Sequence, residues 1–167
     1  MYRIGISKDI HRLVEGRKLL LGGIHIPFPY GEEAHSDGDV VYHAISEAIL
    51  GALALGDLGR HFPTNDTKTK NLSSDVILNY VSQLMKQHNY SINNIDVQII
   101  LERPKLQEYI EKMRSNVALL VNTIKENVSI KVGTNEGMDA SGKGEAVEAY
   151  AAVILKKNNS DIDGINK

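Results

Sequence analysis

The segment His35-Ser36-Asp37-Gly38-Asp39-Val40-Val41-Tyr42-His43 contains the start of a helix, and this helix decides how the chain folds. Asp37 or Asp39 can cap a helix that runs to about Leu55, because small and apolar residues recur at helical spacing after them. His43 follows Asp39 by four residues, so these two side chains share one face of the expected helix. The segment therefore presents an imidazole at a fixed place on a helix that must pack against the rest of the fold.

A second short segment, Asp9-Ile10-His11, lies in an expected strand, where residues two apart point to the same side of a sheet. Asp9 and His11 can therefore aim at one ion together with His43. One carboxylate and two imidazoles leave a fourth position open, which is typical of catalytic zinc rather than of structural zinc. The sequence thus predicts an open zinc site. The alternative is that Asp9 caps a turn and that both histidines are hydrogen-bonded structural residues.

The composition excludes several classes of protein. The chain has 167 residues, of which 42% are hydrophobic and 24% charged, and its formal net charge is −2. These values suit one ordinary globular core, and the absence of a basic block argues against binding to nucleic acid. The chain has no cysteine, which excludes disulfides and thiolate chemistry. No apolar run is long enough to cross a bilayer, so no membrane partner is expected. A cytoplasmic location is predicted, with a plastid as the alternative if a transit peptide has been removed.

The hydrophobic pattern predicts one α+β domain. We expect a mixed sheet of four to five strands with helices packed on one face. Strands are expected at residues 2–11, 19–27, 93–101, 128–133 and 146–155, the last either a strand or a short helix followed by a strand. Helices are expected from Asp37 or Asp39 to about residue 55, from residues 73–75 to about 88, and at about residues 107–125. The domain is predicted to span residues 1–157, and residues 158–167 form a polar tail.

Two loops contain residues that suit phosphate or a second metal ion. His35 and Ser36 add donors beside the amino terminus of the first helix, although the local pattern favours a plain capping loop. The run Gly133-Thr134-Asn135-Glu136-Gly137 lets the backbone approach phosphate, and Glu136 suits Mg²⁺ already held by phosphates. The alternative for this second loop is an ordinary turn. Asp57 can cap a helix end or grip a substrate hydroxyl, and Lys105 is either a charge at a sheet edge or a solvated lysine.

Taken in order, these segments resemble the 2-C-methyl-D-erythritol 2,4-cyclodiphosphate synthase family of the non-mevalonate isoprenoid pathway. The resemblance extends to about Leu155. The matching segments are Arg3-Ile4-Gly5, Asp9-Ile10-His11-Arg12-Leu13, Leu21-Gly22-Gly23-Ile24-His25-Ile26-Pro27, His35-Ser36-Asp37-Gly38-Asp39 with His43, Leu50-Gly51-Ala52-Leu53-Ala54-Leu55-Gly56-Asp57-Leu58-Gly59, His61-Phe62-Pro63, Arg103-Pro104-Lys105 and Gly142-Lys143-Gly144-Glu145.

The resemblance implies a metal-dependent lyase that converts 4-diphosphocytidyl-2-C-methyl-D-erythritol 2-phosphate into the cyclic diphosphate and releases CMP. It implies a homotrimer with active sites between subunits. Zinc would bind to Asp9, His11 and His43, and a second divalent ion, Mg²⁺ or Mn²⁺, to Glu136. The implied catalytic residues are His35 and Ser36 on the substrate phosphate, Asp57 on an erythritol hydroxyl, and Thr134. The cytidine diphosphate pocket would be formed by Leu101, Pro104, Lys105, Leu106, Gly133, Thr134 and Lys143.

Several positions depart from the pattern of this family. The run Ile6-Ser7-Lys8 replaces a histidine-glycine-aromatic run, and residues 133–137 replace a threonine-rich run ending in Glu-Lys. Ala140 stands where the family has an aromatic residue, and Lys143 replaces an arginine, which keeps the charge but loses a bidentate fork. Two other functions stay open. One is a zinc hydrolase with Asp37 or Asp39 as general base, and the other is a trimer that binds cytidine nucleotides without turnover.

Overall fold

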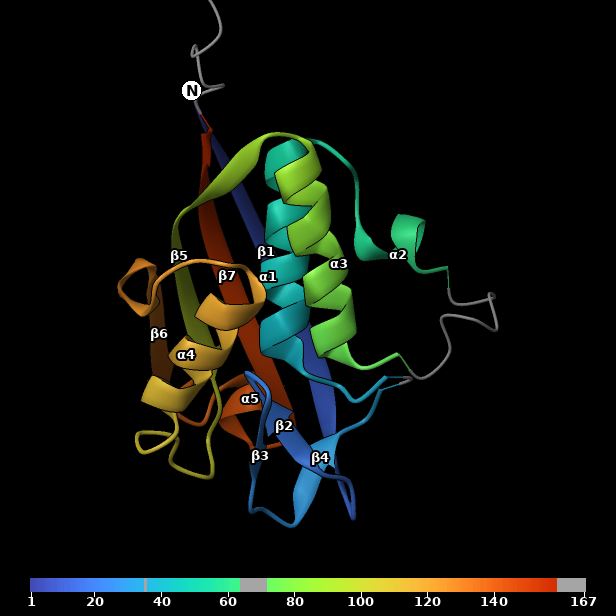
Figure 1. The fold of residues 1–167 in the computed structure, drawn as a ribbon. Coiled ribbons are helices and arrows are strands. Elements are labelled where there is room, and N and C mark those ends of the chain that lie inside the picture. The colour runs from blue at the N-terminus through green and yellow to red at the C-terminus, as the bar shows by residue number, and fades with distance from the viewer. Residues whose placement is uncertain (35, 64–71, 159–167) are drawn as a thin grey trace, which may run out of the picture.

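A mixed sheet of five strands forms the back of the computed structural model, in the order β4-β1-β7-β5-β6 (Figure 1). The structure describes residues 1–34, 36–63 and 72–158. Neighbouring strands are antiparallel except β5 and β6, which run parallel. The strands of this sheet are β1 (Tyr2–Glu15), β4 (Tyr30–Glu32), β5 (Tyr90–Ile100), β6 (Val128–Gly133) and β7 (Ala146–Lys157). A separate hairpin pairs β2 (Leu19–Leu21) with β3 (Ile24–Ile26).

The main helices cover one face of this sheet, the side turned to the viewer in Figure 1. They are α1 (Val40–Leu53), α3 (Ser74–Gln87) and α4 (Ile110–Leu120). Helix α1 packs on β1 and β7, and α3 packs on α1, so α1 is buried almost all round and its sequence is nearly all apolar or small. Shorter helical turns are α2 (Leu58–His61), the 3₁₀ turn η1 (Lys125–Asn127) and α5 (Asp139–Gly142). The predicted α+β class, with helices on one face, is confirmed.

Asp39 caps α1 and also holds the β2–β3 hairpin in place. Its buried carboxylate accepts hydrogen bonds from Val41 N and Tyr42 N in the helix, from Gly22 N at 3.0 Å and from Gly23 N at 2.7 Å. Both glycines have positive φ, 56° and 73°, which directs their N–H groups at one carboxylate. Burial raises the pKa of Asp39 to about 6, against the hydrogen bonds from these N–H groups, which lower it. Asp39 is therefore committed to the fold and is not free to act as a general base.

Strand β1 and helix α1 lie unusually close together at Gly5. A Cβ atom added at Gly5 would lie 1.8 Å from Ala48 O and 2.8 Å from Ala52 N. We expect Gly5→Ala to lower the free energy of unfolding by at least about 2 kcal/mol, because the helix must move away from the sheet. Urea unfolding measures this loss. The control is Gly51→Ala in the same helix, where an added Cβ meets nothing within 4 Å and should be neutral or stabilising. Equal losses in both variants would contradict the prediction.

The structure differs from the expected boundaries mainly at short elements. The stretch 19–27 is a hairpin rather than one strand, because Gly22 and Gly23 reverse the chain. Strand β4 lies in the expected loop 28–37, where it pairs with the end of β1. The expected loop from Arg60 and the turns after β6 contain parts of α2 and α5. Helix α4 is shorter than the predicted 107–125.

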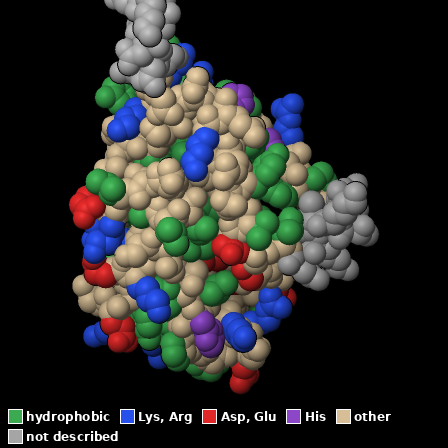
Figure 2. Space-filling view, in the orientation of Figure 1, with side chains coloured by type: hydrophobic (Ala, Val, Ile, Leu, Met, Phe, Trp, Pro, Cys, Tyr) green, Lys and Arg blue, Asp and Glu red, His purple; other side chains and the backbone are tan. Residues whose placement is uncertain are grey.

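The end of the chain also differs from the expectation. Strand β7 is continuous to Lys157, with no helical part. Of the predicted tail, Asn158 is described, and residues 159–167 lie outside the described part of the chain. In the described residues, no helix combines the length and apolarity that crossing a membrane requires. On the face shown in Figure 2, charged side chains of both signs are scattered and do not form one basic patch.

Candidate active site

The contact between β1 and α1 continues from Gly5 to the candidate metal ligands. Along β1, every second residue faces α1, and along α1 every fourth residue faces β1. The two repeats nearly match, since two strand residues advance about 6.6 Å and four helix residues about 6 Å. Asp9 on the strand therefore meets His43 on the helix, and His11 lies one step farther along. We call this line of paired residues the β1–α1 seam, and it consists of Gly5, Ser7, Asp9, His11, His43, Glu47 and Ala48.

Asp9, His11 and His43 form a cluster whose candidate ligand atoms all lie within 4.8 Å of one another. Asp9 Oδ2 is 3.1 Å from His43 Nδ1 and 3.3 Å from His11 Nε2. The two imidazole rings meet edge to face, with centroids 5.6 Å apart. All three residues are half-buried, so an ion placed among them would remain accessible on one side. The predicted grouping of these three side chains is confirmed, and the donor set of one carboxylate and two imidazoles suits zinc.

Each histidine is oriented by a second hydrogen bond away from the cluster. His11 Nδ1 lies 2.8 Å from Gly38 O, which accepts a hydrogen bond and leaves Nε2 facing Asp9. His43 Nε2 lies 3.0 Å from Ser74 Oγ, and Ser74 donates its own proton to the Asp37 carboxylate. Ser74 must then accept from His43 Nε2–H, so that the other nitrogen, Nδ1, faces Asp9. Such outer hydrogen bonds are the usual support of metal-binding histidines.

The pKa values of the cluster reflect its compact charge arrangement. Burial raises the pKa of Asp9, but the hydrogen bond from His43 and the charges of His11 and His43 outweigh it, so the pKa is lowered overall. Burial lowers the pKa of His43, and the hydrogen bond and charge of Asp9 outweigh this effect, so that pKa is raised. The cluster therefore favours a positive charge beside the Asp9 carboxylate, which a divalent cation would provide in place of a proton.

If the cluster binds a metal ion, we expect Ser74→Ala to weaken that binding, measured with zinc, while the fold persists. The hydroxyl between His43 and Asp37 is lost, so the His43 ring is no longer held in one tautomer and orientation. The affinity for zinc should fall about 10- to 100-fold, the usual effect of removing such a partner. Competition with a chromophoric chelator measures this affinity. Ser115→Ala, on the exposed side of α4, is the matched control and should bind zinc as the unaltered protein does.

The sequence also predicts Asp57, His35 and Ser36 as substrate-binding residues, and in the described part of the chain neither Asp57 nor Ser36 hydrogen-bonds to the metal cluster. Asp57 caps α2, where it accepts a hydrogen bond from Arg60 N at 2.9 Å, and its carboxylate is exposed. Ser36 Oγ accepts from Gly38 N at 3.2 Å in the loop before α1. His35 lies outside the described residues.

The first backbone N–H groups of α1 already have hydrogen-bond partners. Val40 N donates to the buried Glu32, and Val41 N and Tyr42 N donate to Asp39. Burial and the charge of Asp39 raise the pKa of Glu32 well above its usual range. A phosphate bound at this loop would therefore depend on side-chain donors such as Ser36 rather than on these three backbone N–H groups.

The predicted nucleotide residues gather where the parallel strands β5 and β6 end. Ile100 pairs with Gly133 at these ends, and Leu101 N donates to Gly133 O at 3.0 Å. Leu101 and Leu106 are buried, so they can offer only main-chain groups, whereas Lys105 is exposed beyond the cis Arg103–Pro104 peptide. Open sheets bind ligands outside the carboxyl ends of parallel strands, which suits this position.

The loop after β6 presents the predicted Thr134 and Glu136 to solvent. Thr134 Oγ1 donates to Glu136 Oε1 at 3.2 Å, and Glu136 has a positive φ of 51°. Glu136 is not part of the Asp9–His11–His43 cluster. Three strand spacings separate β1 from β6, about 14 Å across the sheet. Within one chain, the metal cluster on β1 and α1 and the predicted nucleotide residues at the ends of β5 and β6 therefore lie apart.

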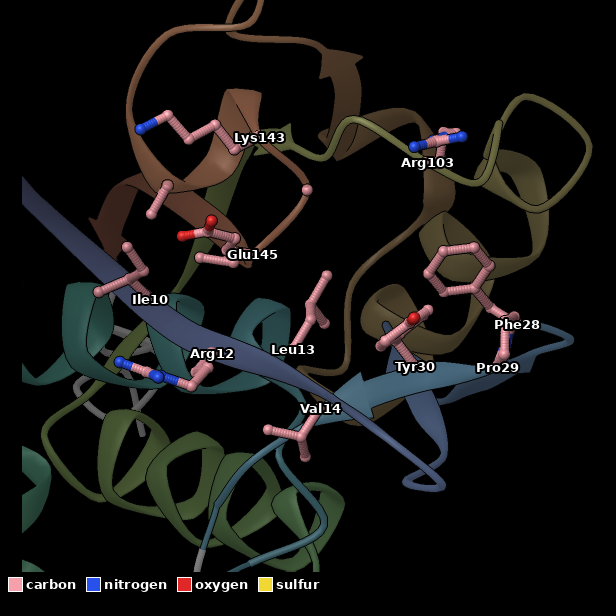
Figure 3. A pocket seen from close by; sticks show the side chains of 13 residues that line it. Ile10, Arg12, Leu13, Val14, Phe28, Pro29, Tyr30, Arg103, Lys143 and Glu145 are labelled. Atoms are coloured by element: carbon pink, nitrogen blue, oxygen red, sulfur yellow. The ribbon is translucent and has the colours of Figure 1, made fainter.

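A cavity of about 940 Å³ lies on the side of β1 opposite to Asp9 and His11 (Figure 3). Ile10 and Arg12 line it, since they alternate along the strand with the metal-cluster residues. Lys143, which the resemblance places in the cytidine diphosphate pocket, borders the same cavity together with Arg103. The cavity is therefore separate from the metal cluster, and Lys143 belongs with this side of the molecule.

Two residues that lie next to the cluster were not found from the sequence. Ser74 lies 31 residues from His43 and 37 from Asp37, and no local pattern joins them. Glu47 follows His43 by one helical turn, so the helix repeat could have identified it as the next residue of the seam.

Comparison with known proteins agrees with this site. Residues 2–156 match the model of the YgbB family. A 2-C-methyl-D-erythritol 2,4-cyclodiphosphate synthase from Carboxydothermus hydrogenoformans is 47% identical over 157 residues, which cover 94% of this chain and 96% of the relative. The synthase of the same name from Brachyspira hyodysenteriae is 51% identical over 155 residues, 93% of this chain and 98% of the relative.

A solved structure with the same fold is IspF from Plasmodium falciparum in a CDP complex. It superimposes with a TM-score of 0.83 at 34% identity and covers 95% of this chain and 97% of its own. The chain therefore belongs to the YgbB family, and it has the function of a 2-C-methyl-D-erythritol 2,4-cyclodiphosphate synthase, a lyase of isoprenoid biosynthesis.

Proposed function

We propose that the Asp9–His11–His43 cluster binds zinc as one half of the catalytic site of this lyase. The observation that carries the proposal is the geometry of the cluster, in which three ligand atoms converge and each histidine is fixed by a hydrogen bond from its other nitrogen. When bound, the zinc ion would supply positive charge that orients and neutralises a substrate phosphate. Asp9, His11 and His43 would hold that charge at the contact between β1 and α1.

The reaction needs two anionic groups of one substrate to meet. An oxygen of the 2-phosphate attacks the β-phosphorus of the diphosphate and a new P–O bond forms. The bond from the β-phosphorus to the bridging oxygen of CMP breaks, and CMP leaves with the bonding electrons. No side chain has to act as a nucleophile, so the protein contributes mainly positioning and charge neutralisation. In this proposal His35 and Ser36 bind the 2-phosphate and Asp57 binds a hydroxyl of the methylerythritol part.

The cytidine diphosphate part is proposed to bind at the ends of β5 and β6. Leu101, Pro104, Lys105 and Leu106 would form one wall, and Gly133 and Thr134 the other, with Lys143 contributing a charge. Glu136 would bind the second divalent ion, Mg²⁺ or Mn²⁺, beside the diphosphate. The CDP complex of the Plasmodium falciparum relative supports a cytidine nucleotide as ligand. The exposure of Lys105 and Glu136 leaves both available to a ligand.

A homotrimer would bring these two halves together from neighbouring subunits. The face of β1 that no helix covers carries exposed apolar side chains, Tyr2, Ile4, Ile6 and Ile10, which are between 47% and 77% exposed. Several exposed apolar side chains along one face of a strand are typical of a protein interface, although Lys8 lies among them on this face. The separation of Glu136 from the metal cluster within one chain supports the same arrangement. Residues 1–157 would form the catalytic domain, and the cytoplasmic location stays a prediction.

Phosphorus NMR tests this proposal directly. The purified protein is incubated with 4-diphosphocytidyl-2-C-methyl-D-erythritol 2-phosphate, Zn²⁺ and Mg²⁺. We expect resonances of the cyclic diphosphate and of CMP to appear together in equal amounts. Linear hydrolysed products would overturn the cyclase in favour of a hydrolase. Tight binding of CMP without turnover would mean that the altered loop at residues 133–137 has disabled the chemistry.

A further inference from the structure

The β1–α1 seam extends beyond the metal cluster to Ser7 and Glu47. Ser7 precedes Asp9 by two residues on β1, and Glu47 follows His43 by one turn on α1. Ser7 Oγ donates a hydrogen bond to Glu47 Oε2 at 3.0 Å. The Ser7–Glu47 pair therefore repeats the Asp9–His43 contact one step along the same interface, and it is half-buried like that contact.

The second oxygen of Glu47 reaches a different part of the chain. Glu47 Oε1 accepts a hydrogen bond at 3.4 Å from Leu58 N, the first residue of α2. Asp57, the residue before it, caps the same turn through Arg60 N. The first N–H groups of a helix have no partner within the helix, so these two carboxylates satisfy α2 from outside. Glu47 thus connects the turn that carries Asp57 to the strand and helix that carry the metal ligands.

The connection from α1 to α2 needs such an anchor. It is short, and it bends through Ala54 and Gly56, whose φ angles are positive at 58° and 88°. The Asp57 side chain itself is exposed, so packing around the carboxylate does not fix its position. A displacement of α2 by about 1 Å would misplace a substrate group held by Asp57, and displacements of this size reduce catalysis strongly.

We infer that Glu47 is a positioning residue, which sets the distance between the substrate-binding turn at Asp57 and the metal cluster at Asp9 and His43. This inference rests on the proposed role of Asp57 in binding the methylerythritol part of the substrate. Glu47 does not touch the reacting atoms. It acts by holding Leu58 N, and Ser7 holds Glu47.

Three variants test this role. Glu47→Ala removes both hydrogen bonds and should raise KM about tenfold, the effect of losing one charge-assisted hydrogen bond, while zinc content is unchanged. Glu47→Gln should restore most of the loss, because its amide oxygen can accept from Leu58 N and its NH₂ can donate to Ser7 Oγ. Glu15→Ala, at an exposed position near the end of β1, is the matched control and should leave KM unchanged.

Amide hydrogen exchange at Leu58 gives a readout that does not depend on activity. Exchange should be faster in Glu47→Ala than in the unaltered protein and nearly normal in Glu47→Gln. Equal exchange at Leu58 in all variants would overturn the inference, even if the protein makes the cyclic product. A loss of stability in Glu47→Ala with KM unchanged would also overturn it, because Glu47 would then be only structural. If the unaltered protein makes no cyclic product, the proposed function fails, and the exchange data still decide whether Glu47 holds α2.

Discussion

The variant His43→Ala is expected to lose cyclic diphosphate formation by at least about a thousandfold, which corresponds to roughly 4 kcal/mol of transition-state stabilisation. His43 contributes one of the three converging ligand atoms, and its removal leaves Asp9 and His11 as an incomplete set. Two ligands hold zinc far less tightly than three, so the charge that should orient the phosphate is lost. Phosphorus NMR follows the product, and elemental analysis of the purified variant measures bound zinc.

The control for this variant is His88→Ala, which removes an imidazole from an exposed position at the end of α3. It should keep both zinc and activity. Circular dichroism and thermal unfolding must show that His43→Ala is folded, since α1 is central to the core. A folded His43→Ala variant that retains zinc and forms the product at the normal rate would show that the cluster is structural and that catalysis resides elsewhere.

The central elements were predictable because their sequence patterns and their tertiary contacts agree. Helix α1 has a capping aspartate and a long apolar run, and β5 and β6 are apolar segments bounded by polar turns. The short elements were not predictable in the same way. Strand β4 has three residues and exists because it pairs with the end of β1, and α2 is a single turn held by Asp57 and Glu47. Their stability comes from residues far away in the sequence.

The candidate metal ligands were predictable for a related reason. Asp9 and His11 are two apart on a strand, so their shared direction follows from local geometry alone. That His43 would meet them required the packing of α1 on β1, which Gly5 makes possible. Ser74 and Asp37, which orient His43, are joined to it only by the fold. The sequence therefore predicts the candidate ligands but not the groups that orient them.

Two departures from the family's pattern have partners in the structure. Lys8 Nζ lies 2.8 Å from the buried Glu148 and 5.2 Å from the ring centroid of Tyr150. The hydrogen bonds that Lys8 donates to Glu148 and to Tyr150 raise the pKa of Lys8. Ser7, on the opposite side of the strand, donates to Glu47. The run Ile6-Ser7-Lys8 therefore fits this fold without disturbing Asp9, and the Asp9–His11–His43 cluster forms despite the replacement.

Mixed trimers provide the sharpest test of how the two halves of the site combine. His43→Ala should be inactive because its metal half is damaged, and Glu136→Ala because its nucleotide half is damaged. If each site takes its metal half from one subunit and its nucleotide half from the next, a mixed trimer contains some intact sites. Folding the two variants together in equal amounts should restore about one quarter of the activity, because each half comes from an intact subunit about half of the time.

A different outcome is expected if the site does not cross between subunits. If both halves of a site belong to one chain, every chain in the mixture carries one defect, and mixing restores nothing. The mass of each sample in solution, measured by light scattering, must correspond to three chains, since a monomer cannot complement. The control is the unaltered protein, unfolded and refolded in the same way. Full activity of Glu136→Ala on its own would show that Glu136 is not part of the site. Recovery to about a quarter of the activity on mixing would show that one shared site takes Glu136 and His43 from different subunits.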